Sequence, residues 1–401
     1  MSTTESRERL ISSDSHVTVT HDAVKSRLAS KFHEDYDKAV EKMGGGGVAM
    51  RQMQNTMPKG FEGVRHAIGR QGNWDPVERL KAYEGQLFDF MDKNEPPQNL
   101  MLVMGPWNHG GWGGRGRKLQ NVDFGSDTGR YFRSEILAPF FAYHLKGKGT
   151  LKLPEASIFR SGTNKWMAYD TWNPKGSFEQ RGIYLHASGK LSFEKPTDKT
   201  EAFDSYVSDP ANPVPYRKRP ILPTYGPGST WYTWLADDQS FVADRKDVLI
   251  WKSDNLTEDV TITGDIIADL YASTSGTDSD WIVKLIDLYP SDDPKLANYE
   301  LMVADEIFRG RYLKSFEKAE PLTPNAVNKF AIDLRGNDHT FKKGHRIMVE
   351  VQSTWFPLYN RNPQKFVPNI LKAEPGDYQS ATQKIYRSAK FPSHINVNVA
   401  R

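Results

Sequence analysis

The chain has 401 residues, with 53 basic and 50 acidic side chains, a formal net charge of +3, and no cysteine. This length allows two or three domains, and the nearly balanced charge excludes the electrostatic footprint of a protein that binds nucleic acid or an anionic membrane. Without cysteine there are no disulfides, thiolate nucleophiles or cysteine-ligated zinc sites. No apolar stretch approaches the roughly 18 residues of a membrane helix, and the polar N-terminus lacks the apolar core of a secretory signal. We therefore expect no nucleic-acid or membrane partner, while the compartment stays open.

The N-terminal region is predicted to be mostly helical. Between His21 and Met43, apolar residues recur at the spacing of one face of an amphipathic helix. They are Val24, Leu28, Phe32, Tyr36 and Val40. The glycines at 44–47 should end this helix, because glycine is costly in a helix interior.

A short apolar run, Leu100–Met104, is closed by Gly105 and Pro106. Such a run predicts a strand buried on both faces, as in parallel α/β sheets. His109 follows in a glycine-containing loop, and catalytic groups gather at the carboxyl ends of strands in such sheets. An imidazole there can act as a general base near neutral pH. On residue types alone, a packing or solvent-facing histidine is the commoner alternative.

A helix is predicted from Asp127 and Thr128 to about Leu145, where Lys146–Gly149 should break it. Its apolar side chains would cover the sheet that carries the predicted strand at 100–104. They are Ile136, Leu137, Phe140, Phe141 and Leu145.

From Leu151 onward the apolar period changes from 3.6 residues to two. INVNV at 395–399 and IMVEV at 347–351 alternate, and WIVKLIDLY at 281–289 and ITGDIIADLYA at 262–272 are more apolar runs. With Gly, Pro and Asp turns between them, these runs predict an antiparallel sandwich. The proline-rich passage 209–227 is predicted to be an ordered loop, because proline cannot donate to a sheet ladder.

Several motifs resemble, in the same order, one family of enzymes. These are GPWNHGGW at 105–112, SGTNKW at 161–166, SDPANPVPY at 208–216, TSGTDSDWIVKLIDLYP at 274–290 and HTFKKGHRIMVEVQSTWFPLYNRNPQ at 339–364. They are similar to segments of the α/β-hydrolase family that holds X-prolyl dipeptidyl-peptidases, cocaine-esterase-type enzymes and α-amino-acid ester hydrolases. The resemblance covers about residues 86–401. It implies a small peptide or ester substrate, His109 as the base of a Ser-His-Asp triad, and a C-terminal jelly-roll domain that shapes the substrate cleft.

Residues from about 10 to 80 resemble instead the opening of a metal-dependent amidohydrolase. The similar segments are ISSDSHV at 11–17 and RQGNWDPVERL at 70–80. In that family Asp14 and His16 would be metal ligands. A complete (β/α)₈ barrel needs about 250 residues, so only its first piece fits before the change of family near residues 81–90. We therefore predict no metal site and no cofactor, with Asp14 and His16 as candidate ligands that would need partners such as His21, His33 or His66.

These observations predict a mainly β fold in three parts. Residues 1–85 form an amidohydrolase-like, mostly helical segment with an incomplete barrel. Residues 86–150 form the C-terminal remnant of an α/β-hydrolase domain with the histidine loop, and residues 151–401 form a jelly-roll β-sandwich.

The triad partners of His109 are missing from the sequence. An α/β-hydrolase carries its serine in a G-x-S-x-G turn ahead of the acid and the histidine. Before His109 the serines all lie between Ser2 and Ser30, whereas the first glycine is Gly44. Neither Glu84 nor Asp89 matches the family's Gly-Trp-Tyr-Asp-like acid loop. Without a serine the base has no hydroxyl proton to accept, and we predict that this chain alone is inactive.

Two other groups of polar residues could bind a ligand or have a structural role. Five aspartates could hold calcium, although capping of turns is the commoner use of such residues. They are Asp278, Asp280, Asp287, Asp292 and Asp293. His339 and His345 belong to a strand-entry turn and are predicted to be structural.

Three functions stay open. The first is a relative of serine hydrolases that lacks its nucleophile. The second is a β-sandwich that binds a ligand on an aromatic surface formed by Trp231, Tyr232, Trp234, Trp355 and Tyr359. The third is a metal-dependent amidohydrolase. Because the apolar strand at 100–104 has few candidate neighbours before it, a homo-oligomeric contact is also possible.

Overall fold

The computed structural model describes Lys25, Ser30, residues 33–42 and residues 101–400, apart from residues 153, 175, 225 and 226. The chain divides into two compact units, residues 1–100 and 101–401, and each is described by itself. In the first unit, helix α2 spans His33–Lys42 within the predicted N-terminal helix. An ion pair one turn apart, between Lys38 and Glu34 at 2.7 Å, supports it. The candidate metal ligands Asp14 and His16 lie outside the described residues, so the prediction about them stays a prediction.

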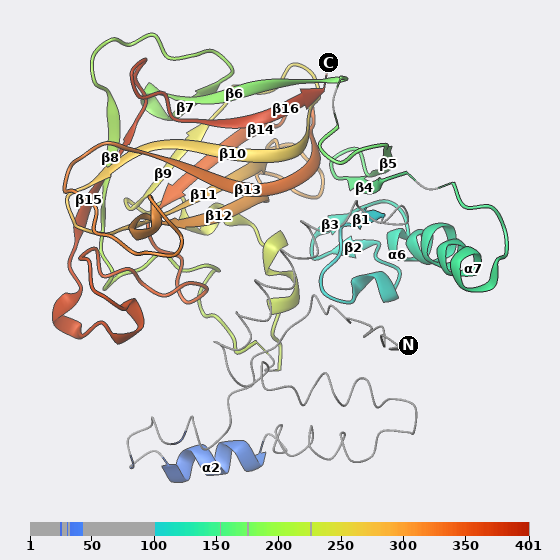
Figure 1. Cartoon of the computed structure of the whole chain (residues 1–401), viewed down its shortest axis with the longest axis horizontal. Coiled ribbons are helices and arrows are strands. Elements are labelled where there is room, and N and C mark those ends of the chain that lie inside the picture. The colour runs from blue at the N-terminus through green and yellow to red at the C-terminus, as the bar shows by residue number, and fades with distance from the viewer. Residues whose placement is uncertain are drawn as a thin grey trace, which may run out of the picture. The chain divides into compact units, whose positions relative to one another are not determined.

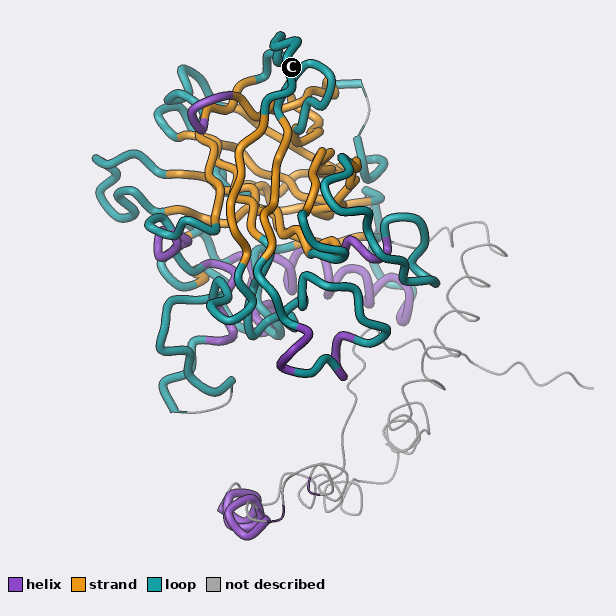
Figure 2. Tube along the Cα trace, turned by 90° about the vertical axis from the view of Figure 1, so that its left-hand side faces the viewer, coloured by secondary structure: helices purple, strands orange, loops and turns teal. Residues whose placement is uncertain are grey.

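The second unit is dominated by one large mixed sheet of 11 strands. Its strands are β6 (Phe178–His186), β7 (Lys190–Ser192), β8 (Phe203–Ser208), β9 (Val248–Lys252), β10 (Val260–Thr274), β11 (Asp280–Leu288), β12 (Glu300–Arg309), β13 (Asn328–Phe341), β14 (Arg346–Gln352), β15 (Ala381–Tyr386) and β16 (His394–Ala400). Their order is β12-β11-β14-β9-β7-β6-β16-β10-β15-β8, with β13 paired to β10. Figures 1 and 2 show these strands gathered in one body. The predicted mainly β fold and the predicted strands are therefore confirmed.

Two halves of this sheet share one hydrophobic core. Side chains from β9, β11, β12 and β14 pack with side chains from β6, β10, β13 and β16. At its centre, the rings of Trp281 and Phe330 lie 4.2 Å apart and both are fully buried. Burying a side chain of this size stabilises the fold by about 1.5–3 kcal/mol. On β16 every second side chain is buried, as the alternation of INVNV predicts.

Strand β11 is buried on both faces. Its inner residues join the main core, whereas Ile282 on the outer face packs with Tyr216, Met302 and Trp355. The segments that supply this second cover lie in loops and short 3₁₀ helices, among them Trp231–Ala236 and Gln239–Val242. The proline-rich passage contributes Tyr216, and its described residues form a loop without a strand, as predicted.

A separate three-stranded sheet contains β1 (Leu102–Met104), β4 (Ala156–Arg160) and β5 (Lys165–Tyr169), and a short hairpin pairs β2 (Lys118–Leu119) with β3 (Val122–Asp123). β1 runs parallel to β4 at the edge of its sheet. Leu102 is 37% exposed and Met104 is 51% exposed. The prediction of a strand buried on both faces is therefore wrong, because among the described residues β1 has one neighbouring strand. The predicted domain limits at residues 85 and 150 stay predictions.

A helical segment follows the predicted limits from Thr128 to Lys146. It consists of α6 (Thr128–Tyr131), a π-helical stretch (Phe132–Leu137) and α7 (Ala138–Lys146). Gly147 ends it with a φ of 57°, a left-handed conformation that glycine adopts readily.

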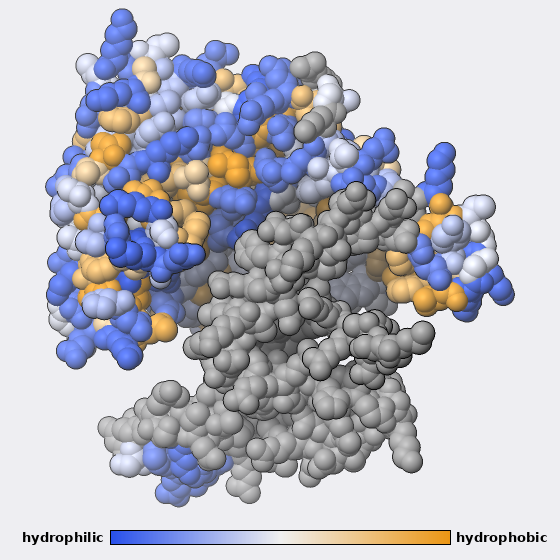
Figure 3. Space-filling model, in the orientation of Figure 1, coloured by the Kyte–Doolittle hydropathy of each residue, from blue (hydrophilic) through white to orange (hydrophobic). Residues whose placement is uncertain are grey.

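The predicted covering role of this segment is largely wrong. Ile136 is buried, but Phe141 is 46% exposed and Leu145 is 73% exposed. Figure 3 shows apolar residues on the outside of the molecule in this region. In the part of the chain that the structure describes, no helix is long and apolar enough to cross a membrane.

The remaining short 3₁₀ helices connect strands. They are Gly111–Gly113, Ala187–Gly189, Gly310–Tyr312, Ile370–Lys372 and Pro375–Asp377.

Candidate functional site

His109 lies in the loop between β1 and the 3₁₀ helix Gly111–Gly113, and its side chain is exposed. Its ring faces Trp112 edge-on, with 6.3 Å between the ring centroids. Among the described residues it has no hydrogen-bond partner, and neither a serine hydroxyl nor a carboxylate is paired with it. The imidazole is therefore exposed to solvent and, within the part of the chain that the structure describes, unpaired.

Trp107 holds this loop in place. Its indole N–H donates to the Thr128 hydroxyl over 2.8 Å, and its ring packs on Phe132 and Trp166 at 5.2 and 5.7 Å. Thr128 in turn donates to the Gly116 carbonyl over 2.5 Å. The loop after β1 is thus anchored on one side by a partly buried aromatic contact, while the His109 side chain is exposed.

A cavity of about 500 Å³ lies beside the loop, between the β2–β3 hairpin, the end of β4 and the large sheet. Its walls include Met104, Trp107, Phe124 and Met302. This volume falls within the range of about 300–1,000 Å³ that is typical of small-molecule pockets. His109 is not among the residues that line it, so the predicted base and this cavity are separate features.

Asp287 accepts hydrogen bonds from two histidines that line the cavity, His339 and His345. His345 Nδ1 is 2.8 Å from Asp287 Oδ1, and His339 Nε2 is 3.1 Å from Asp287 Oδ2. Burial alone would raise the pKa of Asp287, but the two hydrogen bonds outweigh it and hold the pKa below its usual range. All three side chains are buried, as is typical of the structural role predicted for the histidines.

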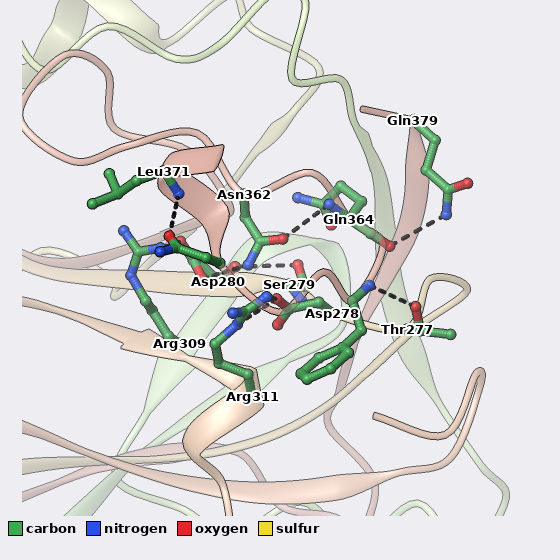
Figure 4. Close-up of polar contacts among 12 residues, drawn as sticks. Thr277, Asp278, Ser279, Asp280, Arg309, Arg311, Asn362, Gln364, Leu371 and Gln379 are labelled. Carbon is green, nitrogen blue, oxygen red and sulfur yellow. Dashed lines mark hydrogen bonds and ion pairs between the residues drawn. The ribbon is translucent and has the colours of Figure 1, made fainter. Parts of the chain in front are cut away.

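The Asp278–Asp280 region is a buried ionic network (Figure 4). Arg311 donates two hydrogen bonds to Asp278, over 2.8 and 2.7 Å, and Asn362 donates to Asp280 over 2.8 Å. Burial raises the pKa of Asp280 to about 7, although the positive charge of Arg309 opposes this. Burial also raises the pKa of Asp278, against the effect of Arg311.

The expectation that turn capping accounts for these aspartates is therefore wrong for Asp278 and Asp280, whose carboxyls pair with side chains inside the fold. Asp293 does cap a turn, because it accepts from the backbone N–H groups of Lys295 and Leu296. Within the described ranges, no group of three or more His, Asp or Glu side chains is arranged to hold a metal ion.

The aromatic surface predicted for ligand binding is partly a core. Trp355 is fully buried, and its ring contacts Trp234 at 5.6 Å and Tyr359 at 6.1 Å. Trp355 covers Ile282 and the buried Lys284 of β11, so it is unavailable to a ligand. Tyr232 keeps an exposed side chain.

Residues 149–396 match the family described as the X-Pro dipeptidyl-peptidase C-terminal non-catalytic domain. The chain belongs to this family. The resemblance read from the sequence motifs is therefore confirmed.

Cocaine esterase from Rhodococcus sp. (strain MB1 Bresler) is 30% identical over 308 residues, which are 73% of this chain and 50% of the relative. Among solved structures, an aminopeptidase from a marine sediment archaeon, Thaumarchaeota archaeon, matches with a TM-score of 0.74 and 45% identity, over 76% of this chain and 51% of that protein. An α-amino acid ester hydrolase matches with a TM-score of 0.72 and 43% identity, over 81% and 53%. The chain thus spans about half the length of these relatives.

Proposed function

We propose that this chain is part of a serine-type hydrolase that cleaves ester or peptide bonds in small substrates, with His109 as the general base. The observation that carries the proposal is the exposed imidazole of His109 in the loop after β1, which has no partner among the described residues. The relatives of the chain include an esterase, an aminopeptidase and an ester hydrolase. In this reaction a neutral imidazole accepts the proton of the attacking serine and then passes it to the leaving group.

In the same proposal, the β-rich part is a jelly-roll domain that shapes the substrate cleft. Two packed halves of a large sheet around one core support this arrangement. In this arrangement His109 would perform the proton transfer. The hydroxyl and the carboxylate that complete a triad are not paired with His109 among the described residues.

The proposal includes the prediction that this chain alone shows no His109-dependent turnover. Its test is hydrolysis of p-nitrophenyl esters and amino-acid p-nitroanilides by the purified chain and by His109→Ala. We expect the two proteins to release p-nitrophenol and p-nitroaniline at the same rate. Turnover well above background that is abolished in His109→Ala would show that the serine partner is present in this chain.

The ligand-binding alternative has less support, because Trp355 of the expected aromatic surface is buried. The predicted homo-oligomeric contact stays a prediction.

A further inference from the structure

A separate pocket lies on the outer face of the large sheet, where β6, β16 and β10 run side by side (Figure 1). Its volume is about 430 Å³, which falls within the range of small-molecule pockets. Its lining combines four side-chain amides with one carboxylate and one aromatic ring, from Asn173, Gln180, Asn396, Asn398, Asp265 and Phe178. We call this cavity the amide pocket. It shares no residue with the cavity beside the His109 loop.

An irregularity in β10 makes room for the amide pocket. The pairing of β10 with β13 shifts between Asp265 and Ile267, and its ladder with β16 is interrupted over the same stretch. Gly264, at this interruption, has a φ of 82°, and a Cβ there would lie 2.6 Å from Asn173 Oδ1 and 3.2 Å from Asn398 Nδ2. Glycine therefore lets two amides approach the backbone of β10 at a break in the sheet. Breaks of this kind commonly redirect side chains next to functional sites.

The amide pocket has one fixed polar wall and two amides that are available to a ligand. Asn173 Nδ2 donates to Asp265 Oδ2 over 2.9 Å, and Asn173 Oδ1 accepts from the Asp265 N–H over 2.9 Å. This pair of bonds holds the amide and the carboxylate in place. The side chains of Gln180 and Asn398 have no hydrogen-bond partner among the described residues. Their donors and acceptors can therefore bind a ligand without breaking a contact of the fold.

The lining selects an uncharged ligand that carries several hydroxyl groups. An amide both donates and accepts, as a hydroxyl does, so Gln180 and Asn398 can each pair with neighbouring hydroxyls. Among the described residues that line the pocket there is no lysine or arginine, and the Asp265 carboxylate repels an anion. Phe178 and Ile267 add apolar surface on which the C–H face of a sugar ring can pack. Strand β16 is paired on both sides, with β6 and β10, so a peptide cannot bind to it as an added strand.

We propose that the amide pocket binds a neutral saccharide. Gln180 and Asn398 hydrogen-bond to its ring hydroxyls, Asp265 accepts a hydrogen bond from a further hydroxyl, and Phe178 packs against the ring. A binding role agrees with the description of the matched family as a non-catalytic domain. The β-rich part of the chain would then hold a carbohydrate at a place remote in sequence from His109.

The experiment applies the purified full chain to an array of neutral oligosaccharides, acidic oligosaccharides and short peptides, and then measures affinity for the bound compounds by isothermal titration calorimetry. We expect binding to neutral oligosaccharides alone. Asn398→Ala and Gln180→Ala should each weaken binding roughly tenfold, the upper end of what one hydrogen bond between neutral groups contributes. Asn398→Asp keeps the shape of the side chain but removes its donors and adds a second negative charge to the pocket, so it should weaken binding at least as much.

Asn255→Ala is the matched control. Asn255 is also an exposed amide without a hydrogen-bond partner among the described residues, and it lies outside the amide pocket. This variant should bind with wild-type affinity, and all the variants should keep the wild-type denaturation midpoint, because none of the changed side chains is buried.

Four results would overturn the proposal. They are an array without binding to neutral oligosaccharides, a preference for acidic oligosaccharides or peptides, an affinity that is unchanged in Asn398→Ala or Gln180→Ala, and an equal loss in Asn255→Ala. Because the measurement is of binding and needs no turnover, its result is independent of the His109-dependent hydrolysis tested above.

Discussion

Side chains of similar kinds are buried in the large sheet and exposed in the segment from Met101 to Lys146. In the sheet, Trp281 and Phe330 are fully buried, and charged residues such as Asp278 are paired inside the fold. In the segment, Phe141 and Leu145 are exposed and His109 has no hydrogen-bond partner among the described residues. The sheet buries its apolar side chains and pairs its buried charges, whereas the segment exposes apolar and basic side chains to solvent.

The largest contrast should appear on removing an aromatic side chain from each region. Trp281→Ala should lower the free energy of unfolding by about 3–5 kcal/mol, because it leaves a cavity in a fully packed core. Phe141→Ala should change it by no more than about 0.5 kcal/mol, since the ring is already half exposed. Denaturant unfolding measures both, and equal losses would show that α7 is packed as tightly as the core.

The ion pairs of the two regions should differ nearly as much in their contribution to the free energy of unfolding. Arg311→Met leaves the Asp278 carboxyl buried without its partner and should cost about 3 kcal/mol of unfolding free energy. Arg115→Met removes a pair with Asp127 in which the arginine is 75% exposed, and should cost less than about 1 kcal/mol. Urea titrations of both variants test this, and a cost for Arg115→Met that matches Arg311→Met would contradict the division into two regions.

Histidine substitutions offer a smaller contrast. His345→Ala removes one of two hydrogen bonds to the buried Asp287 carboxylate and should cost about 1–3 kcal/mol. His109→Ala should leave the free energy of unfolding within about 0.5 kcal/mol of the wild type, because the ring is exposed and has no hydrogen-bond partner among the described residues. Thermal or denaturant unfolding distinguishes them, and a large loss in His109→Ala would mean that the loop carries structural contacts.

The smallest expected contrast is in how the stability of the fold changes with pH. The pKa of Asp280 is raised from 3.8 to about 7, so the folded state binds a proton more tightly than the unfolded state, and stability is lost as pH rises through that window. Asp280→Asn should remove this decline. Asp123 has the opposite sign: a backbone hydrogen bond from Gly125 lowers its pKa, so any stability it contributes is lost only as pH falls below its usual range.

The measurement is the unfolding midpoint of the wild type, Asp280→Asn and Asp123→Asn. It is made at about pH 4.5 and about pH 7, near the two ends of the range in which Asp280 titrates. A decline with rising pH that is unchanged in Asp280→Asn would assign it to another group.

Local patterns predicted the elements well. The helix ends at Gly147 because a left-handed residue is needed there, and that requirement is visible in the Lys-Gly-Lys-Gly passage. The alternation in β16 follows from one buried face, so it too can be seen in the letters. The exposure of β1 could not be predicted, because burial depends on which strands become its neighbours.

The polar sites show the same limit. Asp278 and Asp280 carry the composition of a turn or of a calcium ligand, and only the position of Arg311, 33 residues away from Asp278, decides that they pair inside the fold. No spacing rule connects Ser161 with His339, whose side chains are hydrogen-bonded although they are 178 residues apart. The sequence feature closest to a signal of this contact is that the motifs SGTNKW and HTFKKGH both lie at the ends of strands.

By itself, the sequence determined the elements, the mainly β class and the family, because periodicity, turn residues and motifs act over a few residues. The tertiary structure decided which side chains meet. It left His109 without a hydrogen-bond partner among the described residues, exposed Leu102 and Phe141, and brought Ser161 to His339. Those outcomes depend on strand pairing and register, which join residues far apart in the chain and are not written in any local stretch of it.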